Sequence, residues 1–435
     1  MVKKVAFHTL GCKVNQAESE AMKTLFQSRG YQVVDFNEPA DVYVINTCTV
    51  THLADRKSRQ MIRQARRRNP DAVVAAVGCY VQANREEVAK HTDVDLLIGT
   101  EKRQNLVDLV EKAGKEQRLI NAVGDIMAAK EFEELPLDFP ATRTRAFLKI
   151  QEGCNQFCTY CIIPYTRGPI RSLPLEKVLQ AAEVYVAKGY KEIVLTGIHI
   201  GLYGTDLSGD LTLVQAVEGL LAVPGLERLR ISSIEPEEVT QELLALMAGS
   251  SKICPHLHIP LQSGSDRILA KMNRPYTTSD FCRVVNQARD LIPEIAISTD
   301  IIAGFPGEGE EEFAATIDFV RRQRFSRLHV FPYSPRRGTP AAAFKEQVTH
   351  QIKEERVRSL VKLGKELSLA FHRQQVGKTL SVLVEYEPDR ETGLLAGYSG
   401  NYIRVLFAGT NNLAGRIVQV LITEALEDVC WGIIS

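Results

Sequence analysis

The chain has 435 residues and an apolar share of 45%, which is enough for two or three domains with ordinary cores. Lys plus Arg and Asp plus Glu number 53 each, so the net charge gives no indication of a nucleic-acid partner. Only locally basic segments can give one. The chain has 9 cysteines, no secretion-signal pattern in its opening residues and no apolar stretch near the roughly 18 residues of a membrane helix. These features predict a reduced, cytoplasmic protein with no membrane span.

Short apolar runs alternate with helical patterns in the first part of the chain. The runs lie at residues 5–10, 31–36, 42–47, 73–78 and 94–98, and helical periodicity appears at residues 18–27 and 56–68. This alternation predicts a parallel, Rossmann-like α/β domain over residues 1–125.

Three separated cysteines occupy equivalent places in this expected sheet. Cys12 follows the first apolar run, Cys48 ends the third and Cys79 ends the fourth. Parallel strands bring their carboxyl ends to one edge, where open α/β sheets bind ligands. The pattern predicts a three-cysteine metal cluster, and the alternative is three buried core cysteines.

A basic segment lies between these cysteines. It contains a single acid, Asp55, and the cations Arg56, Lys57, Arg59, Arg63, Arg66, Arg67 and Arg68. Several of them share one helical face, which either follows RNA phosphates or is simply solvated. After this domain, residues 132–140 are acidic and proline-bearing, and we expect a linker there.

The next motif is a compact CxxxCxxC trio of Cys154, Cys158 and Cys161, just after an apolar run at residues 147–150. Structural zinc sites need four protein ligands and iron-sulfur clusters normally take four cysteines, so three thiolates point to a cluster with one open iron. The alternative is a zinc site that borrows a distant fourth ligand such as Cys254.

This trio resembles the radical S-adenosylmethionine (SAM) superfamily. The resemblance implies a [4Fe-4S] cluster whose open iron chelates SAM, and reductive cleavage of SAM to a 5′-deoxyadenosyl radical. It also implies that Tyr160, just before the third cysteine, packs near the adenine of SAM.

Six strand candidates and intervening helices follow over residues 140–370. The strands are expected at 146–150, 192–196, 229–233, 256–259, 295–302 and 328–331, and helices at 175–188, 211–221 and 310–323. Repeated βα units predict an open, TIM-like barrel with its chemistry at the carboxyl ends of the strands. Segments at those ends resemble SAM-binding segments of the superfamily, and the implied SAM-binding residues are Gly197, Gln262, Ser263, Asp300 and Gly304.

Three further polar residues lie near these motifs. Arg167 and Arg171 follow the cluster loop, where guanidinium groups suit the SAM carboxylate or an RNA phosphate, although a surface role is the alternative. His199 follows the second strand beside apolar neighbours, so we leave it without a role.

The last part of the chain changes to short β-like runs. A helix is expected at residues 352–374 and strands at 379–386, 394–398, 402–407, 416–422 and 429–434, which predicts a small antiparallel β-barrel over residues 373–435. It resembles a TRAM domain, an RNA-binding module of tRNA-modifying enzymes. Five Arg or Lys against seven Asp or Glu give it a net charge of −2, so this barrel does not rely on bulk charge to hold RNA. Stacking of bases on Tyr398 or Tyr402 is one interpretation, and a packing domain is the other.

The whole chain resembles the radical SAM methylthiotransferases. The residues that carry this resemblance are those at 9–20, which include Leu10-Gly11-Cys12-Lys13-Val14-Asn15, with 46–50 and 78–80. The resemblance implies a second [4Fe-4S] cluster on Cys12, Cys48 and Cys79 that carries the sulfur to be transferred. One SAM then supplies the methyl group and another the radical.

Within that family, the first of these segments resembles the branch acting at C2 of N6-threonylcarbamoyladenosine at tRNA position 37. The implied partners are tRNA, an electron donor of flavodoxin or ferredoxin type, and a sulfur donor. Isopentenyladenosine in tRNA and a ribosomal-protein aspartate are the alternative substrates. A non-catalytic iron-sulfur RNA-binding sensor is the alternative of a different class.

Overall fold

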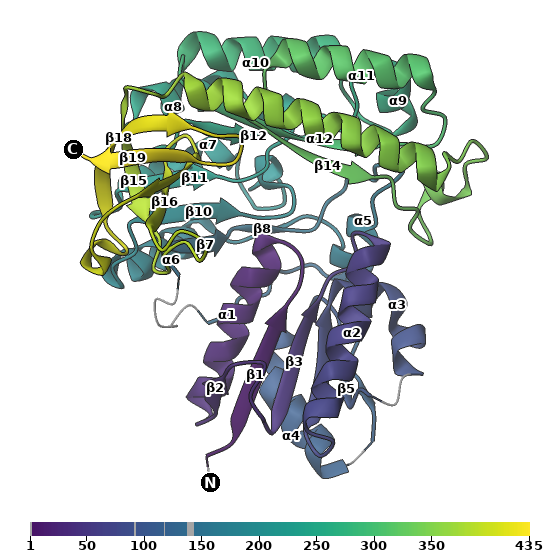
Figure 1. Ribbon diagram of the computed structural model, residues 1–435. Coiled ribbons are helices and arrows are strands. Elements are labelled where there is room, and N and C mark those ends of the chain that lie inside the picture. Colours follow the sequence, from purple (N-terminus) through teal and green to yellow (C-terminus); the bar gives the residue numbers. More distant parts are fainter. Residues whose placement is uncertain (1, 91–92, 117, 137–142) are drawn as a thin grey trace.

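A computed structural model describes residues 2–90, 93–116, 118–136 and 143–435 (Figure 1). The predicted linker at residues 132–140 falls partly outside these described residues. Among the described residues, no helix is both long and apolar enough to cross a membrane.

The amino-terminal domain is a six-stranded sheet in which every pairing is parallel, in the order β2-β1-β3-β4-β5-β6. Its strands are β1 (Lys4–Thr9), β2 (Gln32–Val34), β3 (Val42–Thr47), β4 (Val73–Gly78), β5 (Leu96–Ile98) and β6 (Ile120–Asn121), and its helices are α1 (Lys13–Ser28), α2 (His52–Arg68), α3 (Cys79–Ala89) and α4 (Leu106–Glu116). The α/β prediction is confirmed. Strand β3 is buried at every position because α2 and α3 cover one face of the sheet, and α1 and α4 cover the other.

The central domain is an open barrel of six parallel strands. They are β7 (Arg145–Lys149), β10 (Glu192–Thr196), β11 (Arg228–Ile231), β12 (His256–His258), β13 (Ala296–Ala303) and β14 (Arg327–Pro332). Two three-stranded sheets are joined by isolated bridges between the β11 and β12 segments, and no pairing closes β7 onto β14 in the described parts of the chain. The predicted TIM-like open barrel is confirmed.

Helices surround this barrel, and a short hairpin holds the loop of the second trio. The helices are α5 (Ile163–Arg167), α6 (Leu175–Ala187), α7 (Leu213–Leu221), α8 (Gln241–Gly249), α9 (Asp266–Lys271), α10 (Thr278–Leu291), α11 (Glu310–Gln323) and α12 (His350–Arg373). The hairpin pairs β8 (Gln151–Glu152) with β9 (Arg171–Ser172), so the trio and α5 lie between its two strands.

The carboxyl-terminal domain is a closed five-stranded barrel in the order β15-β16-β17-β19-β18. The strands are β15 (Thr379–Val384), β16 (Leu395–Ser399), β17 (Arg404–Phe407), β18 (Ile417–Ala425) and β19 (Cys430–Ile434). The prediction of an antiparallel barrel is wrong for one pairing, because β17 and β19 run parallel. The chain leaves β17, crosses to β18 and returns through β19, so the final strand enters beside β17 in the same direction.

The three domains pack on one another. Figure 1 shows the amino-terminal domain below the barrel, with the carboxyl ends of β1 and β3 directed toward it. Helix α1 contacts β7, α3 contacts α5, and α12 lies against β14. The two cysteine trios therefore belong to facing edges of neighbouring domains.

Candidate functional site

The first trio converges at the carboxyl edge of the amino-terminal sheet. Cys12 follows β1 and Cys48 follows β3, and the strand order reverses between these two strands, where such sheets form their ligand crevice. Gly11 has φ +96°, and a Cβ there would lie 2.9 Å from the Cys48 sulfur, so glycine is required for this close approach. Burial, with the nearby Cys79 and Cys12 thiols, raises the pKa of Cys48 to about 12.

Arg167 is fully buried and contacts this trio from the barrel side. Its Nε donates to the Cys79 sulfur at 3.2 Å, and its Nη2 donates to Asn15 Oδ1 at 2.5 Å. Arg171 is buried beside it and donates to the Arg167 carbonyl oxygen at 3.0 Å. The predictions that these two arginines face SAM, RNA or solvent are therefore wrong, because buried acids of the domain interface hold them inside.

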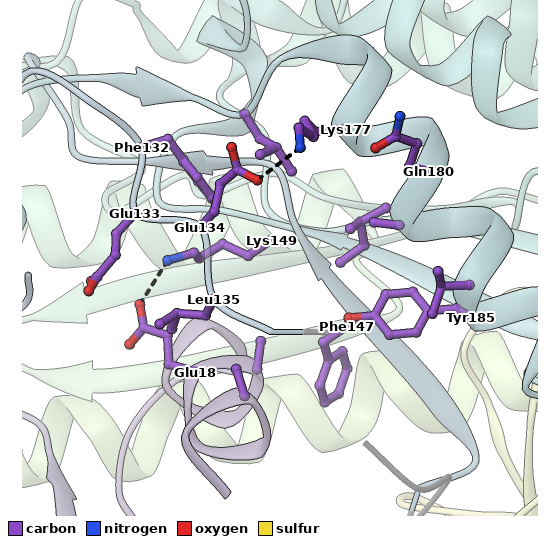
Figure 2. Close-up of a pocket in the computed structure, with 16 residues that line it drawn as sticks. Glu18, Phe132, Glu133, Glu134, Leu135, Phe147, Lys149, Lys177, Gln180 and Tyr185 are labelled. Atoms are coloured by element: carbon purple, nitrogen blue, oxygen red, sulfur yellow. Dashed lines mark hydrogen bonds and ion pairs between the residues drawn. The ribbon is translucent and has the colours of Figure 1, made fainter. Parts of the chain in front are cut away.

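Those acids form an ionic network across the domain boundary. Arg167 Nη1 lies 2.6 Å from Glu18 Oε1 and 2.7 Å from Glu152 Oε1, and Arg103 Nη1 lies 2.5 Å from Glu18 Oε1. Figure 2 shows Lys149 reaching Glu18 beneath Phe132. Burial raises the pKa of Glu18, but Arg103, Arg167 and Lys149 outweigh it and hold this pKa at about 2. The network is ionised at neutral pH, and Arg167 joins it to Cys79.

The second trio lies in the loop between β8 and α5. Gly153 opens this loop with φ +78°, and a Cβ there would lie 1.8 Å from the Pro169 carbonyl oxygen. Burial raises the pKa of Cys161, and the neighbouring Cys158 and Cys154 thiols raise it further. Buried Arg274 donates to the Cys158 sulfur at 3.2 Å and pairs with Glu235. Each trio therefore has one sulfur that accepts a hydrogen bond from a buried arginine.

His199 also contacts the second trio, although its sequence context gave it no role. Its Nδ1 lies 3.3 Å from the Cys154 sulfur and its Nε2 lies 2.6 Å from Glu238 Oε1. Burial lowers its pKa, but the hydrogen bonds to Cys154 and Glu238 outweigh burial and raise the pKa to about 10. Buried Gln151 fixes this loop, because its Oε1 accepts from the backbone N–H of His199 at 2.8 Å. Neither residue carries a local motif that would have revealed it.

The donor set fits clusters rather than a single metal ion. Cys254, the fourth ligand of the zinc alternative, is buried near Arg230 and Glu192 beside the amino-terminal ends of β10 and β11, whereas the trio follows the carboxyl end of β7. Within the described ranges, no group of three or more His, Cys, Asp or Glu side chains is arranged to hold one ion. Each trio instead offers three thiols, the number that a four-iron cluster with one open iron requires.

Most residues of the predicted SAM segments follow the carboxyl ends of strands, whereas Asp300 lies within β13, and their side chains point in different directions. Asp300 Oδ1 lies 3.2 Å from His258 Nε2 inside the barrel. Gln262 has φ +67°, and both its backbone N–H and its carbonyl oxygen form hydrogen bonds with β13. The Ser263 hydroxyl lies 3.4 Å from Thr316 Oγ1, so it faces α11.

The two glycines and the tyrosine of this set occupy crowded positions. A Cβ on Gly197 would lie 2.6 Å from the Ile200 side chain, and one on Gly304, whose φ is +73°, would lie 2.4 Å from Lys353. Tyr160 packs edge-on against Phe305, with ring centroids 6.5 Å apart. These contacts shape the surface beside the second trio.

One cavity of about 760 Å³ extends from the first trio into the barrel. It is lined by Cys12 of the first trio, by Gly197 in the loop that also carries His199, by Asp300 of β13, and by Tyr402 of the carboxyl-terminal barrel. Residues of α1, β12, β13, β14 and α12 also line it, so all three domains enclose this space. Its size is in the range of small-molecule sites and admits a nucleoside.

The two predicted stacking tyrosines face the central barrel. The Tyr402 ring centroid is 4.2 Å from the Arg230 guanidinium carbon, and the Tyr398 ring centroid is 4.6 Å from that of Arg145. Tyr402 has φ +66°, an uncommon conformation for a bulky residue, which turns its ring into the cavity. Arginines of the central barrel therefore already occupy a face of each tyrosine ring.

The basic stripe of α2 is only partly free. Arg59 donates to the Tyr80 hydroxyl at 3.0 Å, Arg66 pairs with Asp95 at 2.5 Å, and Arg68 donates to Asn37 Oδ1 at 2.6 Å. The exposed cations that form no ion pair within the described ranges are Arg56, Lys57, Arg63 and Arg67.

Comparisons with known families match all three domains. The Uncharacterized protein family UPF0004 matches residues 4–99, the Radical SAM superfamily matches residues 148–320, and the TRAM domain matches residues 373–432. The threonylcarbamoyladenosine tRNA methylthiotransferase MtaB of Bacillus subtilis is 46% identical over 97% of this chain and 94% of its own length. This chain belongs to the tRNA methylthiotransferase family.

Other relatives of this methylthiotransferase include enzymes with different substrate names. The protein named MtaB from Aquifex aeolicus is 43% identical over 96% of this chain and 100% of its own length. The tRNA-2-methylthio-N(6)-dimethylallyladenosine synthase of Pelotomaculum thermopropionicum is 35% identical over 100% of this chain and 98% of its own. The chain is therefore an enzyme, and the alternative of a non-catalytic iron-sulfur sensor is not supported.

Solved structures share the fold of this methylthiotransferase. The radical SAM methyltransferase TsrM of Kitasatospora setae has a TM-score of 0.57 at 17% identity, covering 79% of this chain and 77% of its own. The radical SAM enzyme OxsB has a TM-score of 0.52 at 13% identity, covering 82% of this chain and 56% of its own. As a radical SAM methylthiotransferase, the protein uses SAM and two [4Fe-4S] clusters.

Proposed function

We propose that this methylthiotransferase modifies C2 of N6-threonylcarbamoyladenosine at position 37 of tRNA, beside the anticodon. The observation that carries the proposal is the shared cavity, which opens onto Cys12 and onto Gly197 and Asp300. A reaction that draws on two centres needs one space in which the same atom meets both. The names of the two relatives that are 46% and 43% identical support this nucleoside over the dimethylallyl one.

We assign the cluster ligands and SAM contacts residue by residue. Cys154, Cys158 and Cys161 hold the cluster that binds SAM, and Cys12, Cys48 and Cys79 hold the auxiliary cluster. When bound, the clusters and SAM supply the radical and the transferable sulfur. The proposed SAM-binding residues are Tyr160, Gly197, Gln262, Ser263, Asp300 and Gly304.

The chain's own groups orient the ligands and keep them apart from water. Arg167 and Arg274 each donate a hydrogen bond to one cysteine sulfur, and such contacts fix ligand geometry and tune a cluster's reduction potential. Phe305 packs against Tyr160 and shields the side of the SAM site. In this assignment Ser263 acts through its backbone, since its hydroxyl faces Thr316.

The proposal also includes the domain bounds, the electron and sulfur donors and the cellular location. The domains extend over residues 1–125, 140–370 and 373–435, and a flavodoxin or ferredoxin type protein supplies electrons. A separate sulfur donor reloads the auxiliary cluster. The enzyme acts in the cytoplasm, where tRNA is modified and cysteine thiols stay reduced.

Nucleoside mass spectrometry tests the substrate. Total tRNA from a strain that lacks this gene should lose 2-methylthio-N6-threonylcarbamoyladenosine and accumulate the unmethylthiolated form, and the gene should restore it. Loss of the methylthio isopentenyl nucleoside instead would assign the chain to that substrate, and a change confined to a ribosomal protein would remove tRNA from the proposal.

A second prediction concerns the exposed cations of α2. Replacing Arg63 and Arg67 by Ala should lower the slope of log affinity for tRNA against log salt by about two units, roughly one for each lost phosphate contact. Salt-dependent binding measurements check this, with Arg283→Ala on α10 as the control because Arg283 pairs with Asp280. An unchanged slope would mean that the stripe is only a solvated surface.

A further inference from the structure

Lys13 is the first residue of α1 and directly follows the cluster ligand Cys12. It lines the shared cavity, and its ammonium nitrogen lies 5.7 Å from the centroid of the Tyr402 ring. The residue that follows the cluster ligand Cys12 therefore extends a half-buried cation into the cavity toward Tyr402.

The other cations around Tyr402 have carboxylate partners. Arg230 Nε lies 2.8 Å from Glu192 Oε1, and Arg145 Nη2 lies 2.7 Å from Glu385 Oε1. Lys13 forms no ion pair with any carboxylate among the residues that the structure describes. Its charge therefore has no paired carboxylate where it lies beside Tyr402 in the cavity.

Cations elsewhere in this cavity differ from Lys13 in pairing or in exposure. Lys365 lies 2.8 Å from Glu427, and Arg404 lies 2.6 Å from Asp389. Arg327 is exposed to solvent at the amino-terminal end of β14. A partly desolvated ammonium without a counter-ion is costly, and an anion that enters beside it recovers that cost.

We propose that Lys13 binds the threonyl carboxylate of the substrate nucleoside, and this inference rests on the proposed function. In adenine, C2 and the N6 substituent flank N1 on one edge of the ring. A base that turns C2 toward the centre at Cys12 therefore presents its N6 substituent to the residues beside Cys12. A threonylcarbamoyl group brings one carboxylate to this place, whereas an isopentenyl group brings no charge, so Lys13 determines specificity.

The test compares two anticodon stem-loops on the reconstituted holoenzyme. One carries N6-threonylcarbamoyladenosine, and the other carries the same nucleoside with its carboxylate converted to the neutral amide. Steady-state kcat/KM and the equilibrium Kd are measured for the wild type, Lys13→Gln, Lys13→Arg and the control Lys23→Gln. Lys23 lies on the same helix and pairs with Glu20 at 2.9 Å.

The wild type should prefer the carboxylate substrate, and Lys13→Gln should lower kcat/KM and affinity for it by about 10- to 100-fold, the range of a hydrogen bond to a charged group. The amide substrate should change little, Lys13→Arg should keep most of the preference, and Lys23→Gln should match the wild type. An equal loss on both substrates, or a preserved carboxylate preference in Lys13→Gln, would overturn the inference. A wild-type enzyme that ignores both stem-loops and modifies an isopentenyladenosine one would instead overturn the proposed substrate.

Discussion

A variant in which Cys12, Cys48 and Cys79 are all replaced by Ala should still convert SAM to 5′-deoxyadenosine but should form no methylthiolated nucleoside. The expected loss of product is complete, because no thiol of the first trio remains to hold the auxiliary cluster, whereas the ligands of the second trio lie in the barrel loop between β8 and α5 and are unchanged. Anaerobic assays of 5′-deoxyadenosine and of tRNA nucleosides, run on the same preparation, measure both quantities.

The matching variant without Cys154, Cys158 and Cys161 should lose both activities. Iron analysis is the control: wild type should bind about eight irons per chain and each variant about four, if both centres hold four-iron clusters. Circular dichroism must show that both variants fold, since losing a buried cluster can unfold its domain. If the folded variant without Cys12, Cys48 and Cys79 methylthiolates tRNA at the wild-type rate, these three residues are core cysteines and not cluster ligands.

Much of the fold could be predicted because periodic apolar runs report burial on one or both sides of a strand. The run at residues 42–47 became β3, with the same bounds, because a central parallel strand is apolar throughout. The start of helix α1 was harder to predict, because the polar residues among Lys13–Ala17 give no apolar helical pattern. One of them, Asn15, is nevertheless buried, and its side chain donates to the Leu10 carbonyl oxygen at 2.7 Å. The parallel pairing of β17 with β19 depends on a crossover that strand patterns do not record.

The cysteines of both centres could be predicted from their place after strands, but the groups that hold them could not. Arg167 lies 88 residues from Cys79 in sequence and His199 lies 45 from Cys154. Nothing local marks either side chain, because each acts through a contact made only when two domains or two βα units meet. The arginine after the cluster loop suggested an external anion, yet the anions that it meets are the protein's own carboxylates.

The largest effect on stability should come from Glu18→Gln. Glu18 is buried against three cations, Arg103, Arg167 and Lys149, so removing its charge leaves these three cations beside the two carboxylates of Glu133 and Glu152, with an excess of buried positive charge. Breaking a buried pair in this way typically costs about 3 to 5 kcal/mol of unfolding free energy. Guanidinium unfolding, followed anaerobically by the absorbance of the clusters, should show a lower midpoint, with Glu116→Gln as a surface control on α4 whose partner is Arg118.

The pH dependence of this effect has a definite sign. The pKa of Glu18 is held at about 2, below its ordinary value, so the carboxylate stabilises the folded state above the pKa that it has when unfolded. That contribution is lost only as pH falls through the folded pKa. The difference between wild type and Glu18→Gln should therefore stay constant from pH 6 to pH 8, and a difference that varies across this range would point to another titrating group.

The same substitution should also separate stability from chemistry. Arg167 bonds to Glu18 and to the Cys79 sulfur at once, so Glu18→Gln loosens the guanidinium that orients this ligand. Below the unfolding transition, 5′-deoxyadenosine formation should remain near the wild-type rate while methylthiolation falls, by about tenfold or more as for other supporting contacts of metal ligands. Equal rates of methylthiolation in the two folded proteins would confine the network to holding the domains together.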